Sequence, residues 1–248
     1  MARPQISNSS VFFWVSVAIG CVLRLLWPLD MEWKADEKAF YALATQFPSV
    51  GILNSQGVPN AAMSNWILAS LRFVAESPVG LVTLIQGMNA TALLGFIWLC
   101  FRFAQPSLRK SYLWGMQLFA VSPLPIIYSR KIWQQSLIPF FTFLMAYGVV
   151  HRRKFWGGFS FGILGMVICQ IHQAGFFFFP IFLLFLYLLD RKEKKNVPWV
   201  FSVSTGILIG ALGLVPWVLH CLSHPIGRKS AGTYFSNVVS LKFLNALS

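Results

Sequence analysis

The sequence predicts an all-α integral membrane protein, a polytopic bundle of about seven transmembrane helices with interfacial helices in its first outer loop. Hydrophobic residues make up 56% of the chain and charged residues only 11%, and the mean hydropathy is +0.64. A soluble globular domain is far less apolar than this. Apolar runs of about 20 residues, the length that crosses a bilayer core, lie near 10–29, 79–101, 112–128, 132–150, 155–171, 174–189 and 198–220.

The basic residues give a net charge of +13, but they occur in short clusters between the apolar runs. This pattern indicates membrane topology and excludes the basic patch of a soluble nucleic-acid-binding domain. With a cytoplasmic N-terminus, eleven of the twenty basic residues fall on the inner side, as the positive-inside rule expects. These are Arg3, Arg102, Arg109, Lys110, Arg152, Arg153, Lys154, Arg191, Lys192, Lys194 and Lys195.

The first apolar run, 10–29, is too long for a signal peptide and lacks a small-residue cleavage site, so we expect it to remain as an anchor. The segment 28–78 then forms the first outer loop. Two amphipathic patterns in it predict helices that lie in the membrane interface. The first pattern is Phe40, Leu43, Ala44 and Phe47, which Asp36 can cap, and the second is Met63, Trp66, Ile67, Ser70, Phe73 and Val74. The turn formers of 48–59 separate the two.

An acidic cluster lies at the start of this loop. It holds Asp30, Glu32, Asp36 and Glu37, four of the seven carboxylates of the chain. A carboxylate held at the boundary between lipid and water can act as a general base toward a hydroxyl. The alternative is a helix cap followed by a solvated helix start.

Basic and polar residues at the outer ends of later spans add to this pattern. Arg130 and Lys131 begin an outer turn against the positive-inside trend, and together they suit a lipid-linked phosphate. The alternative is binding to ordinary anionic headgroups. His172 and Gln173 interrupt an apolar region at another outer turn and can donate to phosphate or sugar oxygens, or serve only as local hydrogen-bonding groups.

Arg24 lies about one turn inside the end of the first span. An arginine at this depth is costly, so it is expected to bind phosphate, to pair with a carboxylate or to snorkel to the interface. Gln86 and Asn89, three residues apart in the second span, are expected to hold helices together. The four cysteines show no metal-ligand spacing and are expected to be small core residues. They are Cys21, Cys100, Cys169 and Cys221.

The sequence Asp36-Glu37-Lys38-Ala39-Phe40-Tyr41, following an arginine near the end of the first span, resembles the GT-C superfamily of membrane glycosyltransferases. The similarity is to the bacterial branch related to protein O-mannosyltransferases and aminoarabinose transferases. The segment from Val121 to Arg130, followed by Ser136-Leu-Ile-Pro-Phe-Phe, also resembles that family's next outer turn. The resemblance covers most of the chain, so 1–248 is expected to be one GT-C-like transmembrane domain.

The resemblance implies transfer of a sugar from a polyprenyl-phosphate donor to an acceptor hydroxyl, with inversion, at the extracytoplasmic face of a bacterial inner membrane. The acceptor would be a lipid, a glycan or a protein. Asp36 takes the family's place of the general base, and Glu37 assists or orients. The residues expected to contact substrate are Arg24, Tyr41, Arg130, Lys131, Gln135, His172 and Gln173.

Two departures from the family qualify this expectation. The family often has an acidic residue before the span that starts near Leu137, whereas this chain has Gln134 and Gln135. We therefore expect no cofactor, and a divalent metal is not indicated. Family members are also usually longer, which implies a short member or a fragment. The competing hypothesis is a non-catalytic transporter or assembly subunit in which the acidic cluster gates or caps the bundle.

Overall fold

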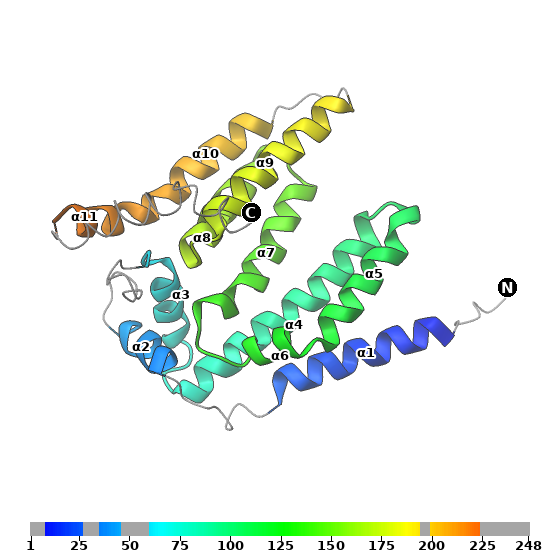
Figure 1. Cartoon of the computed structure of the whole chain (residues 1–248), viewed down its shortest axis with the longest axis horizontal. Helices are drawn as coiled ribbons and strands as arrows, with labels where there is room; N and C mark the ends of the chain where they lie inside the picture. The colour runs from blue at the N-terminus through cyan, green and yellow to red at the C-terminus, as the bar shows by residue number, and fades with distance from the viewer. Residues whose placement is uncertain (1–7, 27–34, 46–59, 194–198, 224–248) are drawn as a thin grey trace, which may run out of the picture.

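A computed structural model describes residues 8–26, 35–45, 60–193 and 199–223, and these residues form helices and connections without any strand (Figure 1). The all-α fold class predicted from the sequence is therefore confirmed for the described part of the chain. The helices are α1 (Asn8–Leu25), α2 (Ala35–Leu43), α3 (Met63–Arg72), α4 (Pro78–Phe103), α5 (Pro106–Val121), α6 (Pro123–Tyr128), α7 (Gln134–Val150), α8 (Phe155–Ile171), α9 (Gly175–Lys192), α10 (Trp199–Ala211), the 3₁₀ helix η1 (Leu212–Leu214) and α11 (Val215–Ser223).

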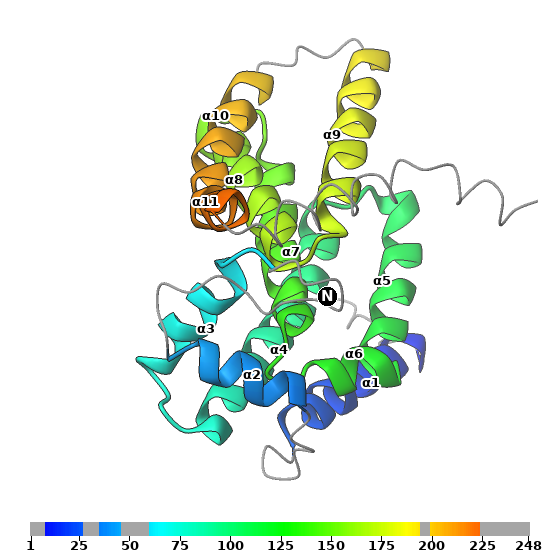
Figure 2. The same cartoon turned by 60° about the vertical axis from the view of Figure 1, so that its left-hand side comes forward.

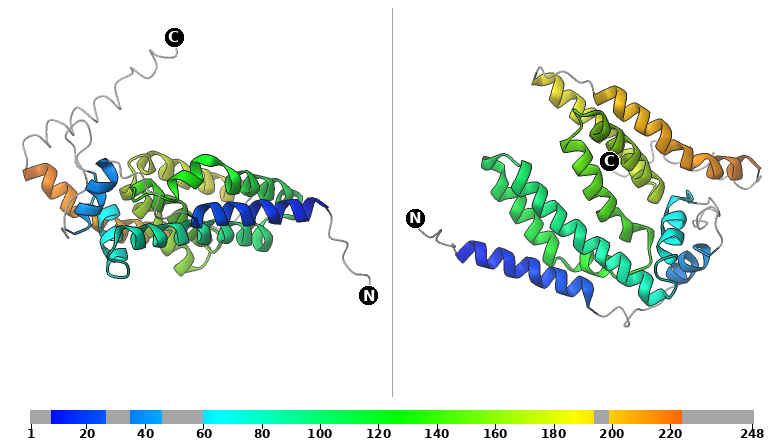
Figure 3. Two further views of the ribbon diagram at one scale, coloured as in Figure 1. Left: turned by 90° about the horizontal axis from the view of Figure 1, so that it is seen from below. Right: turned by 180° about the vertical axis from the view of Figure 1, so that it is seen from behind.

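The long helices form two groups. In the first, α1 packs against α5 and both pack against α4, and in the second, α8 lies between α7, α9 and α10. The packing of α4 against α7 joins the groups, as the views in Figures 2 and 3 show. At this junction the buried Asn89 side chain donates to the carbonyl oxygen of Ser136 at 2.8 Å. The expectation that Asn89 holds helices together is thus confirmed.

Glycine allows α8 and α10 to approach closely. A Cβ atom on Gly162 would overlap the carbonyl oxygen of Val203, and one on Gly206 would overlap the carbonyl oxygen of Phe159. Helix pairs in membranes commonly pack through such small residues, because backbones in contact gain dispersion energy that lipid does not supply. This contact holds α10 against the middle of α8.

The connections between helices gather at two ends of the molecule. We call the α2 end the region where α2, α3, the turn 129–133 and the last turn of α8 meet around one hydrophobic cluster. At the opposite end, the ring of Phe103, the last residue of α4, lies 5.3 Å from that of His151 after α7, and Arg152 donates to Asp190 of α9. The described parts of the connections predicted to be outside thus lie at the α2 end, and the described parts of those predicted to be inside lie at the opposite end.

The described part of each of the seven predicted apolar runs coincides with one helix or with consecutive helices, such as α10, η1 and α11 in the run 198–220, but one run differs from its helix. The run 112–128 is not one helix, because α5 begins earlier, at Pro106, and ends at Val121. Pro123 cannot donate a backbone hydrogen bond, and it holds the preceding Ser122 in extended backbone, so a separate helix, α6, starts there.

The two helices predicted in the first outer loop are present as α2 and α3. Asp36 lies inside the first turn of α2, so it is not the helix cap, because the helix begins one residue earlier, at Ala35. The predicted linker 48–59, Phe47, and the carboxylates Asp30 and Glu32 lie outside the described residues.

Length and composition alone make two of the described helical stretches long and apolar enough to cross a membrane. These are Pro78–Phe103 and Trp199–Ser223, and shorter apolar helices occupy Val11–Leu25, Gln134–Val150 and Phe155–Ile171. Large apolar side chains are exposed along several helices, as in α9, where Phe178, Ile181 and Leu184 are each more than half exposed.

Candidate active site at the α2 end

The first turn of α2 directs its two carboxylates to different sides. Glu37 is 2% exposed and lies on the same face as Phe40 and Ala44, which are buried in the hydrophobic cluster. Residues three and seven positions apart share a helix face, so this is the core face of α2. Asp36 is exposed. The helix therefore presents one carboxylate to solvent and keeps the other against the bundle.

The turn between α6 and α7 is held by short polar contacts. The Ser136 hydroxyl donates to the carbonyl oxygen of Tyr128 at 2.6 Å, and the rings of Tyr128 and Trp133 stack with their centres 5.4 Å apart. The Lys131 ammonium lies 5.9 Å from the centre of the Trp133 ring and has no hydrogen-bond partner among the residues that the structure describes. Arg130 beside it is half-buried. The turn thus holds a lysine ammonium that can still donate to an anion.

The end of α8 carries the third polar segment. His172 leaves the helix in extended backbone, and its Nδ1 accepts a hydrogen bond from the Ala174 amide at 3.2 Å. The neutral ring then carries its proton on Nε2, which can donate to another group. Gln173 donates to the side-chain oxygen of Asn60 at 3.3 Å. This contact joins the first outer loop to the turn between α8 and α9.

One hydrophobic cluster lies beneath all three segments. Phe40 of α2, Ile132 of the turn and Ile171 at the end of α8 are at most 2% exposed, and all belong to this cluster. Each is within four residues of a predicted site residue, namely Asp36, Lys131 and His172. The structure therefore brings these segments, which are distant in the sequence, to one end of the bundle.

Tyr41 has a defined structural contact. Its hydroxyl donates to the carbonyl oxygen of Glu76 at 2.7 Å, and the Arg72 guanidinium lies 4.6 Å from the centre of its ring. These contacts join α2 to the connection between α3 and α4. The predicted contact of Tyr41 with substrate stays a prediction.

Gln135 lies in the first turn of α7 and is half-buried. The side-chain oxygens of Gln134 and Gln135 are both buried, and neither has a hydrogen-bond partner in the described part of the chain. A buried amide oxygen without a donor is costly, so a hydroxyl-bearing ligand would be a favourable partner.

Arg24 is 1% exposed and is used within the fold. Its guanidinium donates to the carbonyl oxygens of Gly20, Ala120 and Phe119 at 2.9, 2.6 and 2.9 Å. These bonds occupy three of the roughly five N–H groups of an arginine and satisfy carbonyls in the last turn of α5. The geometry supports a structural role that joins α1 to α5, rather than the snorkelling considered from the sequence.

Polar residues that the sequence analysis did not single out are buried on α3. Ser64 and Asn65 face the bundle with Leu68, whereas Phe73 and Val74 just after α3 are 92% and 77% exposed. The apolar pattern read from the sequence is therefore divided. Met63 and Ile67 pack against the hydrophobic cluster, whereas the last two residues of the pattern, Phe73 and Val74, are exposed. The missed signal was the pair of polar residues between Met63 and Trp66, which a helical projection places on the other face.

Comparisons with protein-family models, curated proteins and solved structures find no match to this chain. The described residues also contain no group of three His, Cys, Asp or Glu side chains that could hold a metal ion. The four cysteines are free thiols. The function is therefore argued from the site alone.

Proposed function

We propose that this chain is an integral membrane glycosyltransferase of the GT-C type, with about seven spans, that uses a polyprenyl-phosphate sugar. The acceptor hydroxyl oxygen forms a bond to the anomeric carbon as the bond from that carbon to the phosphate oxygen breaks. The hydroxyl proton passes to Asp36, and polyprenyl phosphate leaves with the electron pair. The configuration at the anomeric carbon inverts.

The observation that carries this proposal is the convergence of an acidic, a basic and an imidazole-bearing segment above one hydrophobic cluster. Transfer from an anionic lipid donor needs a base for the acceptor and positive or hydrogen-bonding groups for the departing phosphate. Asp36, Lys131 and His172 are of these types, and their segments share the cluster that contains Phe40 and Ile132.

Burial supports different roles for the two carboxylates of α2. A general base must reach the acceptor hydroxyl, and Asp36 is exposed whereas Glu37 is 2% exposed on the core face. Glu37 is accordingly assigned to positioning α2, and Asp36 to removing the proton. The donor phosphate is assigned to Arg130 and Lys131, with His172 as a further donor.

The membrane setting is supported by two features of the fold. The described residues of the segments predicted to be outside meet at the α2 end, and Arg152, from a cluster predicted to be inside, lies at the opposite end, as expected of a bundle that crosses a bilayer. The apolar residues after α3, Phe73 and Val74, face away from the bundle, as expected of an interfacial segment. The α2 end is accordingly placed at the extracytoplasmic face.

The test is donor turnover in proteoliposomes, with a panel of polyprenyl-phosphate sugars and release of polyprenyl phosphate as the readout. Asp36→Asn keeps the shape of the side chain but cannot take up a proton, so turnover should fall about 10²-fold or more. Thermal unfolding should be nearly unchanged, because exposed side chains contribute little to stability.

Glu76→Gln is the matched control, because Glu76 is an exposed carboxylate on the connection between α3 and α4 at the same end. It should retain full turnover. Full turnover by Asp36→Asn would exclude the general-base role, and equal losses in both variants would indicate a general effect of charge. Absence of turnover by the wild type with every donor would favour the non-catalytic transporter or assembly subunit.

A further inference from the structure

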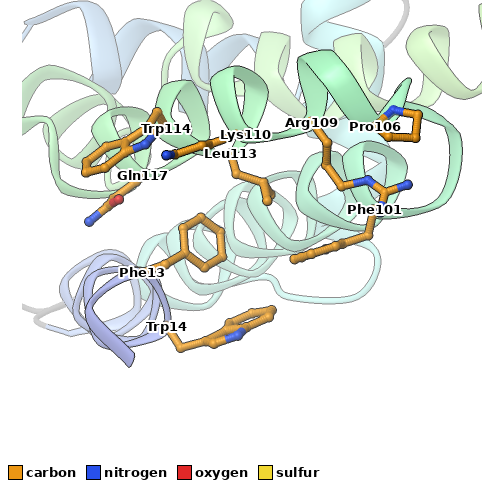
Figure 4. A pocket seen from close by; sticks show the side chains of 9 residues that line it. All are labelled: Phe13, Trp14, Phe101, Pro106, Arg109, Lys110, Leu113, Trp114 and Gln117. Carbon is orange, nitrogen blue, oxygen red and sulfur yellow. The ribbon is translucent and has the colours of Figure 1, made fainter. Parts of the chain in front are cut away.

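A cavity of about 430 Å³ lies at the end of the molecule opposite the proposed active site. It is bounded by the first half of α1, the last turns of α4 and the first half of α5, and Figure 4 shows its lining side chains. The volume is within the range of small-molecule sites, roughly 300–1,000 Å³. The cavity is therefore large enough for a headgroup and the adjoining part of a lipid chain.

Aromatic and aliphatic side chains form its apolar walls. The Trp14 and Phe101 rings stack with their centres 6.0 Å apart, and Phe13 meets Trp14 edge to face at 5.1 Å. Leu113 lines the α5 side. Gln117 donates to the Ser16 hydroxyl at 3.0 Å, which joins α5 to α1 beside these walls. Such walls suit an acyl chain.

The two charged side chains of the lining are basic. Arg109 and Lys110 come from the first turns of α5, and no carboxylate from the described ranges lines the cavity. The Nε atom of Arg109 is buried and has no hydrogen-bond partner within the described residues. An unpaired buried donor on a cation is costly, and an anionic oxygen would satisfy it with a charge-assisted hydrogen bond.

We propose that this cavity binds an anionic glycerophospholipid, with its phosphate held by Arg109 and Lys110 and an acyl chain against Phe13, Trp14 and Leu113. A ligand that is anionic at one end and apolar at the other satisfies both kinds of lining. The predicted topology places this end at the cytoplasmic leaflet, where anionic lipids attract basic side chains. The inference rests on the proposed membrane setting and not on sugar transfer.

Native mass spectrometry of the purified full chain can test it, with phosphatidylglycerol and phosphatidylcholine of identical chains as probes and inorganic phosphate as a third. Phosphatidylglycerol should bind at least about tenfold more tightly than phosphatidylcholine. Arg109→Gln with Lys110→Gln should remove this preference, because both cations are lost. Lys110→Arg keeps the charge and should keep the preference.

The matched control is Arg153→Gln with Lys154→Gln, which removes two adjacent exposed cations at the same end, outside the cavity. This variant should bind phosphatidylglycerol as the wild type does. Equal loss in both double variants, no loss in the first, or loss on Lys110→Arg would overturn the proposal. Inorganic phosphate bound as tightly as the lipid would overturn the role of the apolar walls. This experiment measures lipid binding and not sugar transfer. A failure of the proposed glycosyltransferase activity would therefore not change its result.

Discussion

Charged residues are used differently at the two ends of the bundle. At the opposite end, Arg152 forms a paired contact with Asp190, with nitrogen–oxygen distances of 3.0 and 2.8 Å, and the Trp199 indole donates to the same carboxylate at 2.9 Å. At the α2 end, Asp36 is exposed and the Lys131 ammonium has only an aromatic contact among the described residues. Polar groups that form hydrogen bonds with one another hold helices together, whereas groups with hydrogen-bonding donors or acceptors still available can bind a ligand.

Arg24 shows that the role of a charged residue depends on the groups that it packs against and not on the end of the bundle at which it lies. It lies close to the α2 end, where the sequence made it a candidate for phosphate binding. Its guanidinium nevertheless donates to three backbone carbonyls. Like Arg152, it therefore has partners within the fold. An arginine in an apolar helix is therefore an ambiguous signal, because it suits a ligand and a helix terminus equally.

The largest stability effect is expected from breaking the network at the opposite end. Arg152→Gln would leave the Asp190 carboxylate, which is 1% exposed, without its cation, whereas Arg152 itself is 17% exposed. Breaking a buried pair costs about 3 kcal/mol or more, so the free energy of unfolding should fall by about that amount. Thermal or denaturant unfolding in detergent measures the change.

Arg153→Gln is the matched control, since Arg153 is the neighbouring arginine and is exposed. Its effect should be within about 0.5 kcal/mol. Equal effects of the two variants would show that the charge of this segment matters and that the specific pair does not.

A smaller effect is expected from the glycines between α8 and α10. Gly162→Ala places a methyl group against the carbonyl oxygen of Val203, so the helices must separate, and overpacking of this kind costs about 1–3 kcal/mol. Gly115→Ala in α5 meets no atom within 4 Å and should instead stabilise its helix by up to about 1 kcal/mol. Opposite shifts in thermal unfolding are expected, and a stabilised Gly162→Ala would contradict the close packing.

The sequence predicted the helices better than the site. Apolar runs located most of the long helices, because backbone hydrogen bonding and burial favour helices there regardless of partners, but the start of α5 at Pro106 and the break at Pro123 were not predicted. The role of Arg24 and the burial of Ser64 and Asn65 on α3 could not be obtained in this way. Both depend on which helix lies beside which, as in the contact of Arg24 with the end of α5 and of Ser64 with the bundle.

The convergence of the polar segments was expected only on the condition that the spans bundle. Asp36, Lys131 and His172 were singled out for their chemistry, and the hydrophobic cluster that holds their segments together combines residues from five helices and a turn. The contact of Asn60 with Gln173, 113 residues later, could not be predicted from the sequence, because nothing in the local sequence around either amide indicates which partner it has.

The smallest stability effect, and the sharpest contrast with Arg152, is expected for Lys131. Lys131→Gln removes an ammonium that has no hydrogen-bond partner in the described part of the chain, so unfolding should change by less than about 0.5 kcal/mol. Binding of a polyprenyl-phosphate sugar should nevertheless weaken by about tenfold or more, because a charge-assisted contact to phosphate contributes about 1.5–3 kcal/mol. Lys154→Gln at the opposite end is the control, because Lys154 is exposed and lies outside the lipid cavity, and it should leave donor binding unchanged. If Lys131→Gln destabilised the protein but left donor affinity unchanged, Lys131 would have a structural role like that of Arg152. The proposed difference between the two ends would then be wrong.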